Sequence, residues 1–206
     1  MRIVRAILAA SFSGLVAAGA AGQGSLTAPQ RALSSDAGEA APDQGADSRE
    51  ARLDELFETL AAAPSAEAAK ATERMIVEMW MESGSDTIDL LMRWTLRAMD
   101  DKDYPLALDF LDRITTLNPD YAEGWNKRAT VYFLTDDYAK SLADLERVLA
   151  LEPRHFAALS GLGTILSEIG DDRQAAVAYR RALELDPHLE NVQDALDEID
   201  GAGEGI

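Results

Sequence analysis

Apolar and polar positions between residues 88 and 189 alternate with the period of amphipathic helices, and the pattern recurs in three consecutive segments. In the second half of each segment, small or apolar residues stand at i, i+4 and i+7, which places them on one face of a helix. In the middle segment these residues are Ser141, Leu145 and Val148. The first halves carry a similar stripe, so the pattern predicts two helices in every segment.

Turn signals divide the segments at regular intervals. An acidic pair lies near the middle of each one: Asp100–Asp101, Asp136–Asp137 and Asp171–Asp172. Aspartate suits turns and caps because its side chain competes for backbone N–H groups. A proline closes each segment, at Pro119, Pro153 and Pro187, 34 residues apart. Because a strict 34-residue period is typical of a helix–turn–helix repeat, the sequence predicts three stacked hairpins at 88–121, 122–155 and 156–189.

The three segments resemble the tetratricopeptide repeat (TPR) family. The third segment matches its pattern at Leu159, Leu162, Gly163, Leu166, Ala175, Tyr179, Ala182 and Pro187. The second matches at Trp125, Ala129, Tyr132, Tyr138, Leu145, Val148 and Pro153. The first departs from it, with Trp94 where leucine is usual and Ala98 where an aromatic residue is usual. The resemblance implies an all-α helical-hairpin solenoid of three TPR repeats, and the whole chain also resembles exported alphaproteobacterial TPR proteins.

Helical patterns continue on both sides of the repeats. Residues 47–84 are predicted to form a divergent helical pair, in which residues 47–50 resemble a capping box and Gly84 ends the second helix. Two interpretations stay open for this pair: an N-terminal cap over the open end of the first repeat, or a separate hairpin that docks a partner. Residues 190–200 are predicted to form a C-terminal capping helix, which a repeat stack needs for solubility.

The N-terminal region has the pattern of a targeting segment. Residues 1–20 combine two arginines, an apolar stretch and an A-x-A motif at residues 18–20, as in a secretory signal peptide. Residues 21–46 are rich in small and polar residues and are predicted to be a disordered linker. We therefore expect a periplasmic or secreted protein with no stable membrane insertion after cleavage. The alternative is a protein anchored by an uncleaved N-terminal segment.

Composition excludes several classes of function. The 206 residues include 37 acidic and 19 basic side chains, for a net charge of −18. Such a chain repels nucleic acid and anionic membrane surfaces, so we expect no nucleic-acid partner. It has no cysteine, which excludes disulfides, thiolate metal sites, a catalytic cysteine and lipid attachment at a cysteine.

No motif for catalysis or for a cofactor occurs. The two histidines, His155 and His188, follow the prolines that close repeats two and three, and are expected to be surface turn residues and not metal ligands. No G-x-S-x-G motif occurs, and Gly161 and Gly163 lie in a helix pattern that favours close packing over phosphate binding. We therefore expect no enzyme activity, no metal and no cofactor.

The TPR resemblance implies where a partner would bind, because first helices line the concave face in that family. The corresponding groove residues are Met92, Arg93, Leu96, Met99, Asn126, Lys127, Thr130, Phe133, Ser160, Thr164 and Ser167. Alternatively, Met92, Leu96 and Met99 pack against the preceding cap helix. Some relatives grip a peptide's C-terminal carboxylate with a basic set of residues, whose positions here are Met92, Leu96, Lys127, Ala157 and Gly161. Only Lys127 is basic, so we expect a different ligand.

These patterns together predict an exported, non-catalytic protein–protein interaction scaffold that binds a peptide or helix in its concave groove. The partner would be a protein or peptide whose identity the sequence does not give. The alternative is a structural cell-envelope protein that self-associates.

Overall fold

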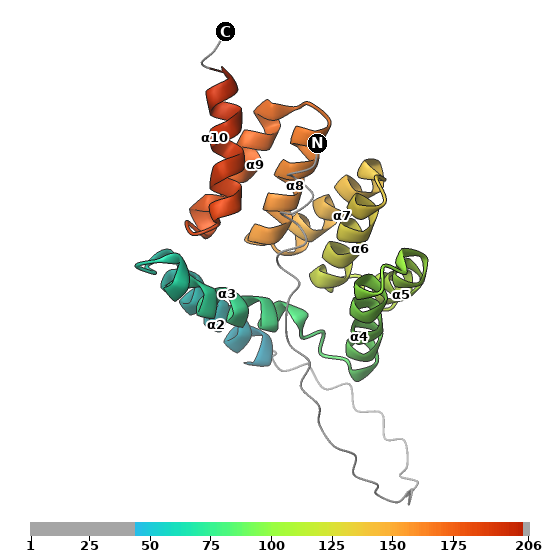
Figure 1. The fold of residues 1–206 in the computed structure, drawn as a ribbon. Helices are drawn as coiled ribbons and strands as arrows, with labels where there is room; N and C mark the ends of the chain where they lie inside the picture. Colours follow the sequence, from blue (N-terminus) through green and yellow to red (C-terminus); the bar gives the residue numbers. More distant parts are fainter. Residues whose placement is uncertain (1–43, 204–206) are drawn as a thin grey trace, which may run out of the picture.

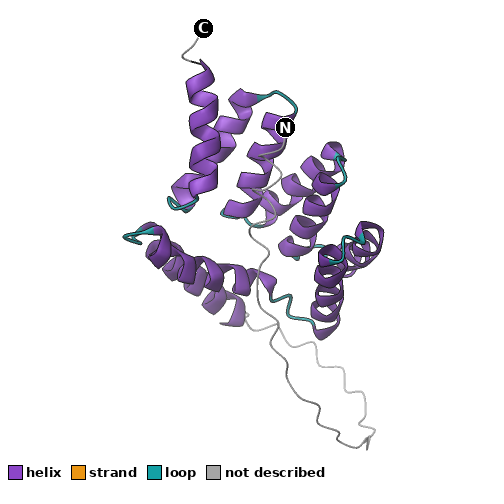
Figure 2. Cartoon of the chain, in the orientation of Figure 1, coloured by secondary structure: helices purple, strands orange, loops and turns teal. Residues whose placement is uncertain are grey.

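The computed structural model describes the backbone of residues 44–203 and the side chains of residues 48–201. Over this range the chain is helical and contains no strand (Figure 2). The predicted signal peptide and nearly all of the predicted linker lie outside the described residues. None of the described helices is both long enough and apolar enough to cross a membrane.

The described helices form four consecutive hairpins and one final helix (Figure 1). The first hairpin comprises α2 (Gln44–Ala61) and α3 (Ala66–Met81). The three predicted repeats follow, as α4 (Asp86–Asp100) with α5 (Tyr104–Leu117), α6 (Ala122–Leu134) with α7 (Tyr138–Leu151), and α8 (Phe156–Glu168) with α9 (Asp172–Leu185). The last helix, α10 (Glu190–Gly203), packs against α9. The all-α solenoid is thus confirmed.

Aspartates start the second helix of each repeat, as the turn signals indicate. The side chains of Asp103, Asp137 and Asp171 accept hydrogen bonds from backbone N–H groups at distances of 3.3, 3.4 and 3.1 Å. Each thereby satisfies one of the free donors of a helix N-terminus. In the first repeat the cap is Asp103 and not the acidic pair at residues 100–101.

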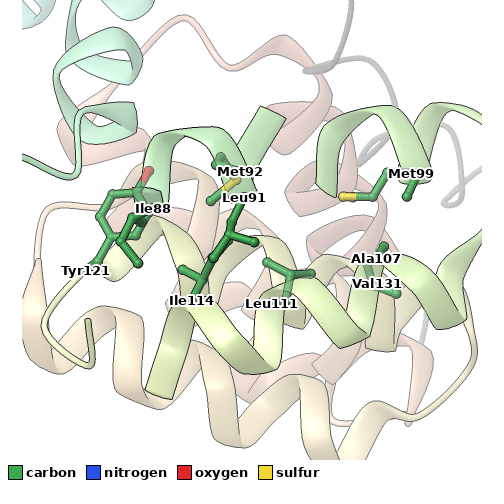
Figure 3. Close-up of a cluster of buried hydrophobic side chains, with 10 residues drawn as sticks. Ile88, Leu91, Met92, Met99, Ala107, Leu111, Ile114, Tyr121 and Val131 are labelled. Carbon is green, nitrogen blue, oxygen red and sulfur yellow. The ribbon is translucent and has the colours of Figure 1, made fainter. Parts of the chain in front are cut away.

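Small residues allow the helices to approach closely. A Cβ atom added to Gly163 would lie 2.4 Å from the ring of Tyr179, and one added to Gly124 would lie 2.7 Å from Ile114. The packing role expected for Gly163 is therefore confirmed. Figure 3 shows the core of the first repeat, where Leu91 of α4 faces Leu111 and Ile114 of α5.

The α2–α3 hairpin does not occupy the place expected of an N-terminal cap. It packs mainly on the turns that follow the second and third repeats, and not on the open end of the first repeat (Figure 1). Its buried side chains surround Phe156 at the start of α8, with Leu185 and Leu189 at the edge of the cluster. The physical reason is aromatic packing. Trp80 stacks on His155 and contacts Phe156, and Phe57 packs edge-on against Phe156.

The start of this hairpin also differs from the prediction. Helix α2 begins at Gln44, so residues 44–46 belong to the helix and not to the linker, and residues 47–50 lie within the helix and not at its start. The guanidinium of Arg49 instead donates to the carbonyl oxygens of Met79 and Glu82, at the C-terminal end of α3. Arg49 thus ties the two helices together at the end of α3, where carbonyl oxygens can accept further hydrogen bonds.

Candidate binding surface

The predicted groove residues lie on α4, α6 and α8, the first helices of the repeats, but most of them are deep in the structure. Six are buried: Met92, Met99, Asn126, Thr130, Phe133 and Thr164. Four are half-buried: Leu96, Lys127, Ser160 and Ser167. Only Arg93 is exposed. Whether these residues bind a partner stays a prediction, and burial restricts direct contact to the last five.

The buried groove residues serve the packing of their own repeats. Met92 and Met99 belong to the core of the first repeat, together with α5 and Val131 of α6. Phe133 lies in the cluster formed by the second repeat and α8. The alternative interpretation placed the methionines against a preceding cap helix; from α3 this core includes only the partly buried Met81.

The hydroxyl groups of the groove are directed toward protein atoms. Thr130 donates to the carbonyl of Asn126 at 2.9 Å, and Thr164 donates to the carbonyl of Ser160 at 3.0 Å. Thr164 also accepts a hydrogen bond of 3.3 Å from the hydroxyl of Tyr179. Serine and threonine back-bond to helix carbonyls in this way wherever water is excluded. The two threonines therefore contribute to structure more than to an open surface.

A buried polar cluster surrounds Glu123 in the first turn of α6. Its carboxylate accepts from the Lys127 ammonium at 2.5 Å, the Asn126 amide at 3.0 Å and the Nε2 atom of His155 at 3.0 Å. Burial opposes ionisation of Glu123, but Lys127 and His155 outweigh it and lower the pKa of Glu123 to about 2. The carboxylate is therefore fully charged at neutral pH and holds repeats two and three together.

His155 joins this cluster to the N-terminal hairpin. Its Nδ1 atom accepts from the backbone N–H of Ala158 at 3.2 Å, so Nε2 carries the proton donated to Glu123. Its ring stacks on Trp80 with centroids 4.2 Å apart and planes inclined by 13°. The expectation of a surface residue is wrong, because the residue is only 1% exposed and caps α8.

Arg154 anchors the hairpin beside this stack. Its guanidinium forms ion pairs with Glu50 at 2.7 Å and Asp54 at 2.5 Å, both on α2, and with Glu152 at 3.3 Å. The same group lies 4.9 Å from the centre of the Phe57 ring. The hairpin is thus attached by aromatic packing and by charge to the turn between α7 and α8.

The position of the hairpin determines which part of the concave side is accessible. It packs over the first turn of α8 at Phe156 and Ala157, and it contacts α6. The accessible or partly accessible groove residues are Arg93, Leu96, Lys127, Ser160 and Ser167. Among the described residues, no group of three or more acidic or histidine side chains is placed to hold a metal ion.

Sequence reasoning missed the cluster of Glu123, His155 and Trp80. The sequence does contain a signal for it in the repeat column of His155, that is, in the equivalent positions of the other repeats. The residues 34 positions before and after His155 are Tyr121 and Leu189. Both are large side chains that pack into the protein. A histidine in such a column is expected to be buried and hydrogen-bonded, whatever its usual preference for the surface.

Comparison with known proteins agrees with this architecture. A family model described as tetratricopeptide repeat matches residues 120–188. A TPR repeat-containing protein of Rhizobium etli is 47% identical over 136 residues, which cover 66% of this chain and 67% of that protein. The chain belongs to the TPR family. It is also 27% identical over 100 residues to small glutamine-rich tetratricopeptide repeat-containing protein 2 of Mycosarcoma maydis, of which it spans only 28%.

Solved TPR structures share the fold at low sequence identity. The Arabidopsis OM64 TPR domain has a TM-score of 0.54 and 19% identity, with 55% of this chain and 94% of that chain covered. The first TPR of Spaghetti (RPAP3), bound to the HSP90 peptide SRMEEVD, has a TM-score of 0.55 and 22% identity, with 57% and 94% covered. These similarities place the present chain in the fold of the TPR family and carry no further information about its ligand.

Proposed function

We propose that this TPR protein is a non-catalytic scaffold that binds a peptide or helix of another protein along its concave side after export to the periplasm or beyond. The observation that supports it is the set of five exposed or half-buried groove residues left beside the docked hairpin: Arg93, Leu96, Lys127, Ser160 and Ser167. They combine one apolar side chain with polar groups, which suits an extended or helical peptide. The net charge of −18 argues against nucleic acid.

The ligand would not be gripped by its C-terminal carboxylate. The solved structure that contains an HSP90 peptide is that of the first TPR of Spaghetti (RPAP3), and that peptide is a ligand of Spaghetti. In the present chain, only Lys127 is basic among the five positions where some TPR proteins bind a C-terminal carboxylate. Its ammonium is already paired with Glu123 at 2.5 Å. Met92, at another of these positions, is buried. A peptide engaged through internal residues therefore fits the surface better than a free chain end.

Site-specific photo-crosslinking in living cells tests this proposal. A benzophenone amino acid placed at Ser160 or at Ser167 should capture one and the same partner protein. Gln174 on α9, an exposed residue outside the concave side, is the matched control position. The intact mass of the recovered protein tests export, since cleavage after residue 20 should remove the first 20 residues.

Two outcomes would contradict the proposal separately. Equal capture from position 174 and from the concave positions would show that the concave side is not the binding surface. An uncleaved N-terminus in all of the cellular protein would remove the cleaved-signal part while leaving the scaffold part to stand.

A further inference from the structure

The first repeat carries an unusual concentration of exposed apolar side chains. Four of the eight large hydrophobic residues that are exposed in the described structure lie on α4 and α5: Leu90, Trp94, Leu106 and Leu117. Trp94 is 47% exposed, and its ring lies 5.7 Å from that of Phe110 on α5, centre to centre. Exposed apolar patches mark interaction sites on soluble proteins.

The repeat columns show what normally covers these positions. The residues 34 positions after Leu90 and Phe110 are Gly124 and Asp144, and both are buried. A Cβ on Gly124 would collide with Ile114 of α5, so the helix that covers this column is the second helix of the preceding repeat. Among the described residues, the equivalent face of the first repeat has no such neighbour, because the α2–α3 hairpin packs elsewhere.

The residues on this face are too large for ordinary repeat stacking. The later repeats have glycine or alanine in the column of Leu90, at Gly124 and Ala158, which allows close approach. Leu90, Trp94 and Phe110 would hold a stacked helix farther away. Tryptophan is enriched among residues that dominate binding energy at protein interfaces. The face is therefore better suited to insert an aromatic anchor into a partner than to receive another copy of the repeat.

The charges around the patch indicate the chemistry of the partner. Arg97 and Arg113 are exposed beside Trp94 and Phe110 and form no ion pair with any described residue. At the joint between repeats one and two, the preceding repeat supplies carboxylates: Asp112 to Arg128 at 2.8 Å, and Asp120 to Arg147 at 3.1 Å. Arg147 stands 34 residues after Arg113.

The local acidic residues do not cancel this pattern. On α4, Asp86 and Asp89 lie in the first turn, and Asp100 lies in the last turn three residues after Arg97 without forming an ion pair with it. On α5, Asp112 is already paired with Arg128 across the joint. Asp109 is exposed on α5 four residues before Arg113, and it too forms no ion pair with that arginine. Within the described part of the chain, the two arginines beside the aromatic pair therefore have acidic neighbours one turn away but no ion-pair partner.

We propose that this end face, defined by Leu90, Trp94, Arg97, Phe110 and Arg113, binds an acidic amphipathic helix of a partner protein. The apolar stripe of that helix covers Trp94 and Phe110, and its carboxylates pair with the two arginines. At Arg113 this pairing is equivalent to that of Arg147 with Asp120 at the internal joint. The surface adjoins the concave groove at Arg93 but shares no residue with it, so variants at Trp94 and at Ser160 test the two proposals separately.

Two synthetic helical peptides of about 20 residues, long enough to form a helix, provide the probes. They share one leucine stripe and differ only in carrying glutamate or lysine at the flanking positions. Fluorescence anisotropy with the full chain should show the glutamate peptide binding about tenfold more tightly than the lysine peptide. The net charge of −18 attracts the lysine peptide over long range. Tighter binding of the glutamate peptide therefore requires a local cationic site.

Variants locate that site. Arg97→Glu with Arg113→Glu should reverse the preference between the two peptides, and Trp94→Ala should weaken both by about tenfold or more. The matched control is Arg173→Glu with Arg181→Glu, which reverses two exposed, unpaired arginines on α9 beside the exposed Val177. It changes the net charge equally and should preserve the preference.

Three results would overturn the proposal. The first is equal binding of both peptides to the unmodified protein, or none. The second is loss of the preference in the α9 control, which would make it an effect of net charge alone. The third is a dimer in sedimentation velocity that Trp94→Ala dissociates, because the occupant of the end face would then be a second copy of this chain.

Discussion

The two turns that follow the second and third repeats both carry a histidine and both contact the α2–α3 hairpin, yet they solve the burial of a carboxylate in opposite ways. At the first turn, His155 and Lys127 surround Glu123 and lower its pKa to about 2. At the second turn, Asp186 is fully buried, and one of its carboxylate oxygens has no hydrogen-bond partner. Burial raises the pKa of Asp186, and the backbone N–H of His188 offsets this only in part.

The difference lies in what the neighbouring elements supply. Helix α6 contributes a cation to the first turn through Lys127, four residues after Glu123. At the second turn the hairpin contributes Glu73, whose pKa is raised by burial and by the charge of Asp186. His188 uses its Nε2 atom to contact the carbonyl of Ala63 at 2.9 Å and not a carboxylate. A buried charge stabilises a joint only where a counter-charge is buried with it.

The two turns are therefore expected to differ in strength and in pH dependence. At neutral pH the charged Glu123 at the turn of His155 should stabilise the docked hairpin. The charged Asp186 at the turn of His188 should lower the free energy of unfolding. Removing the components of each turn in order of expected effect tests this comparison.

The largest effect is expected from Trp80→Ala. The side chain is 6% exposed and packs on His155, Phe57 and Phe156. Replacing a buried tryptophan by alanine costs about 4 kcal/mol in the free energy of unfolding. Urea denaturation measures the change. Trp94→Ala is the matched control, since the same substitution at an exposed site should cost about 0.5 kcal/mol or less. Similar losses in both variants would show that the stack does not hold the hairpin.

A smaller loss is expected from Glu123→Gln, which leaves Lys127 and His155 buried without a carboxylate. At neutral pH it should lower the free energy of unfolding by about 3 kcal/mol in urea denaturation. Because the folded-state pKa of Glu123 is lowered, its stabilisation is complete above the ordinary value of 4.5 and is lost as the pH falls through about 2. The gap between wild type and variant should therefore narrow from pH 4.5 downward. Glu198→Gln, at an exposed site on α10, should change little, and a gap that widens in acid would contradict the assignment.

The sequence predicted the repeats well because their stabilising interactions are periodic. The 34-residue spacing placed α4 to α9, and the glycine at position 163 was correctly explained by close packing. The docking of the hairpin has no period, so the apolar face that contains Ile76 and Trp80 gave no indication of the surface it covers. The expectation that a histidine in a turn lies at the surface also failed at His155. Its repeat position, which is occupied by Tyr121 and Leu189 in the other repeats, determines burial there.

The groove shows the same limit. The TPR resemblance identified the helix face on which Ser160 and Thr164 lie, but depth within that face depends on the neighbouring helix. Thr164 is buried because Tyr179 of α9 reaches it, whereas Ser160 stays partly accessible. A single sequence specifies the columns of such a repeat and leaves the exposure of each residue to the packing between helices.

The smallest effect, and the one of opposite sign, is expected from Asp186→Asn. The amide keeps an oxygen for the hydrogen bond from the backbone N–H of His188, now 3.0 Å from Oδ1, and removes a buried charge that lacks a counter-charge. Its NH₂ group takes the place of the oxygen that has no hydrogen-bond partner. Urea denaturation at pH 7 should show the variant to be more stable by on the order of 1 kcal/mol. Asp194→Asn, on the exposed face of α10, is the control.

The pH dependence of this gain separates a charge effect from improved packing. Because the folded-state pKa of Asp186 is raised, wild-type stability from this group is complete below its ordinary pKa of 3.8 and is lost as the pH rises through the raised value. The advantage of asparagine should therefore be largest at pH 7 and should shrink toward pH 4, where wild type binds the proton. Acid therefore lowers the stability of Asp186→Asn relative to wild type. It raises the stability of Glu123→Gln relative to wild type, because there it is a loss that shrinks. An advantage that stayed constant with pH would mean that the buried charge of Asp186 is not what weakens the second turn.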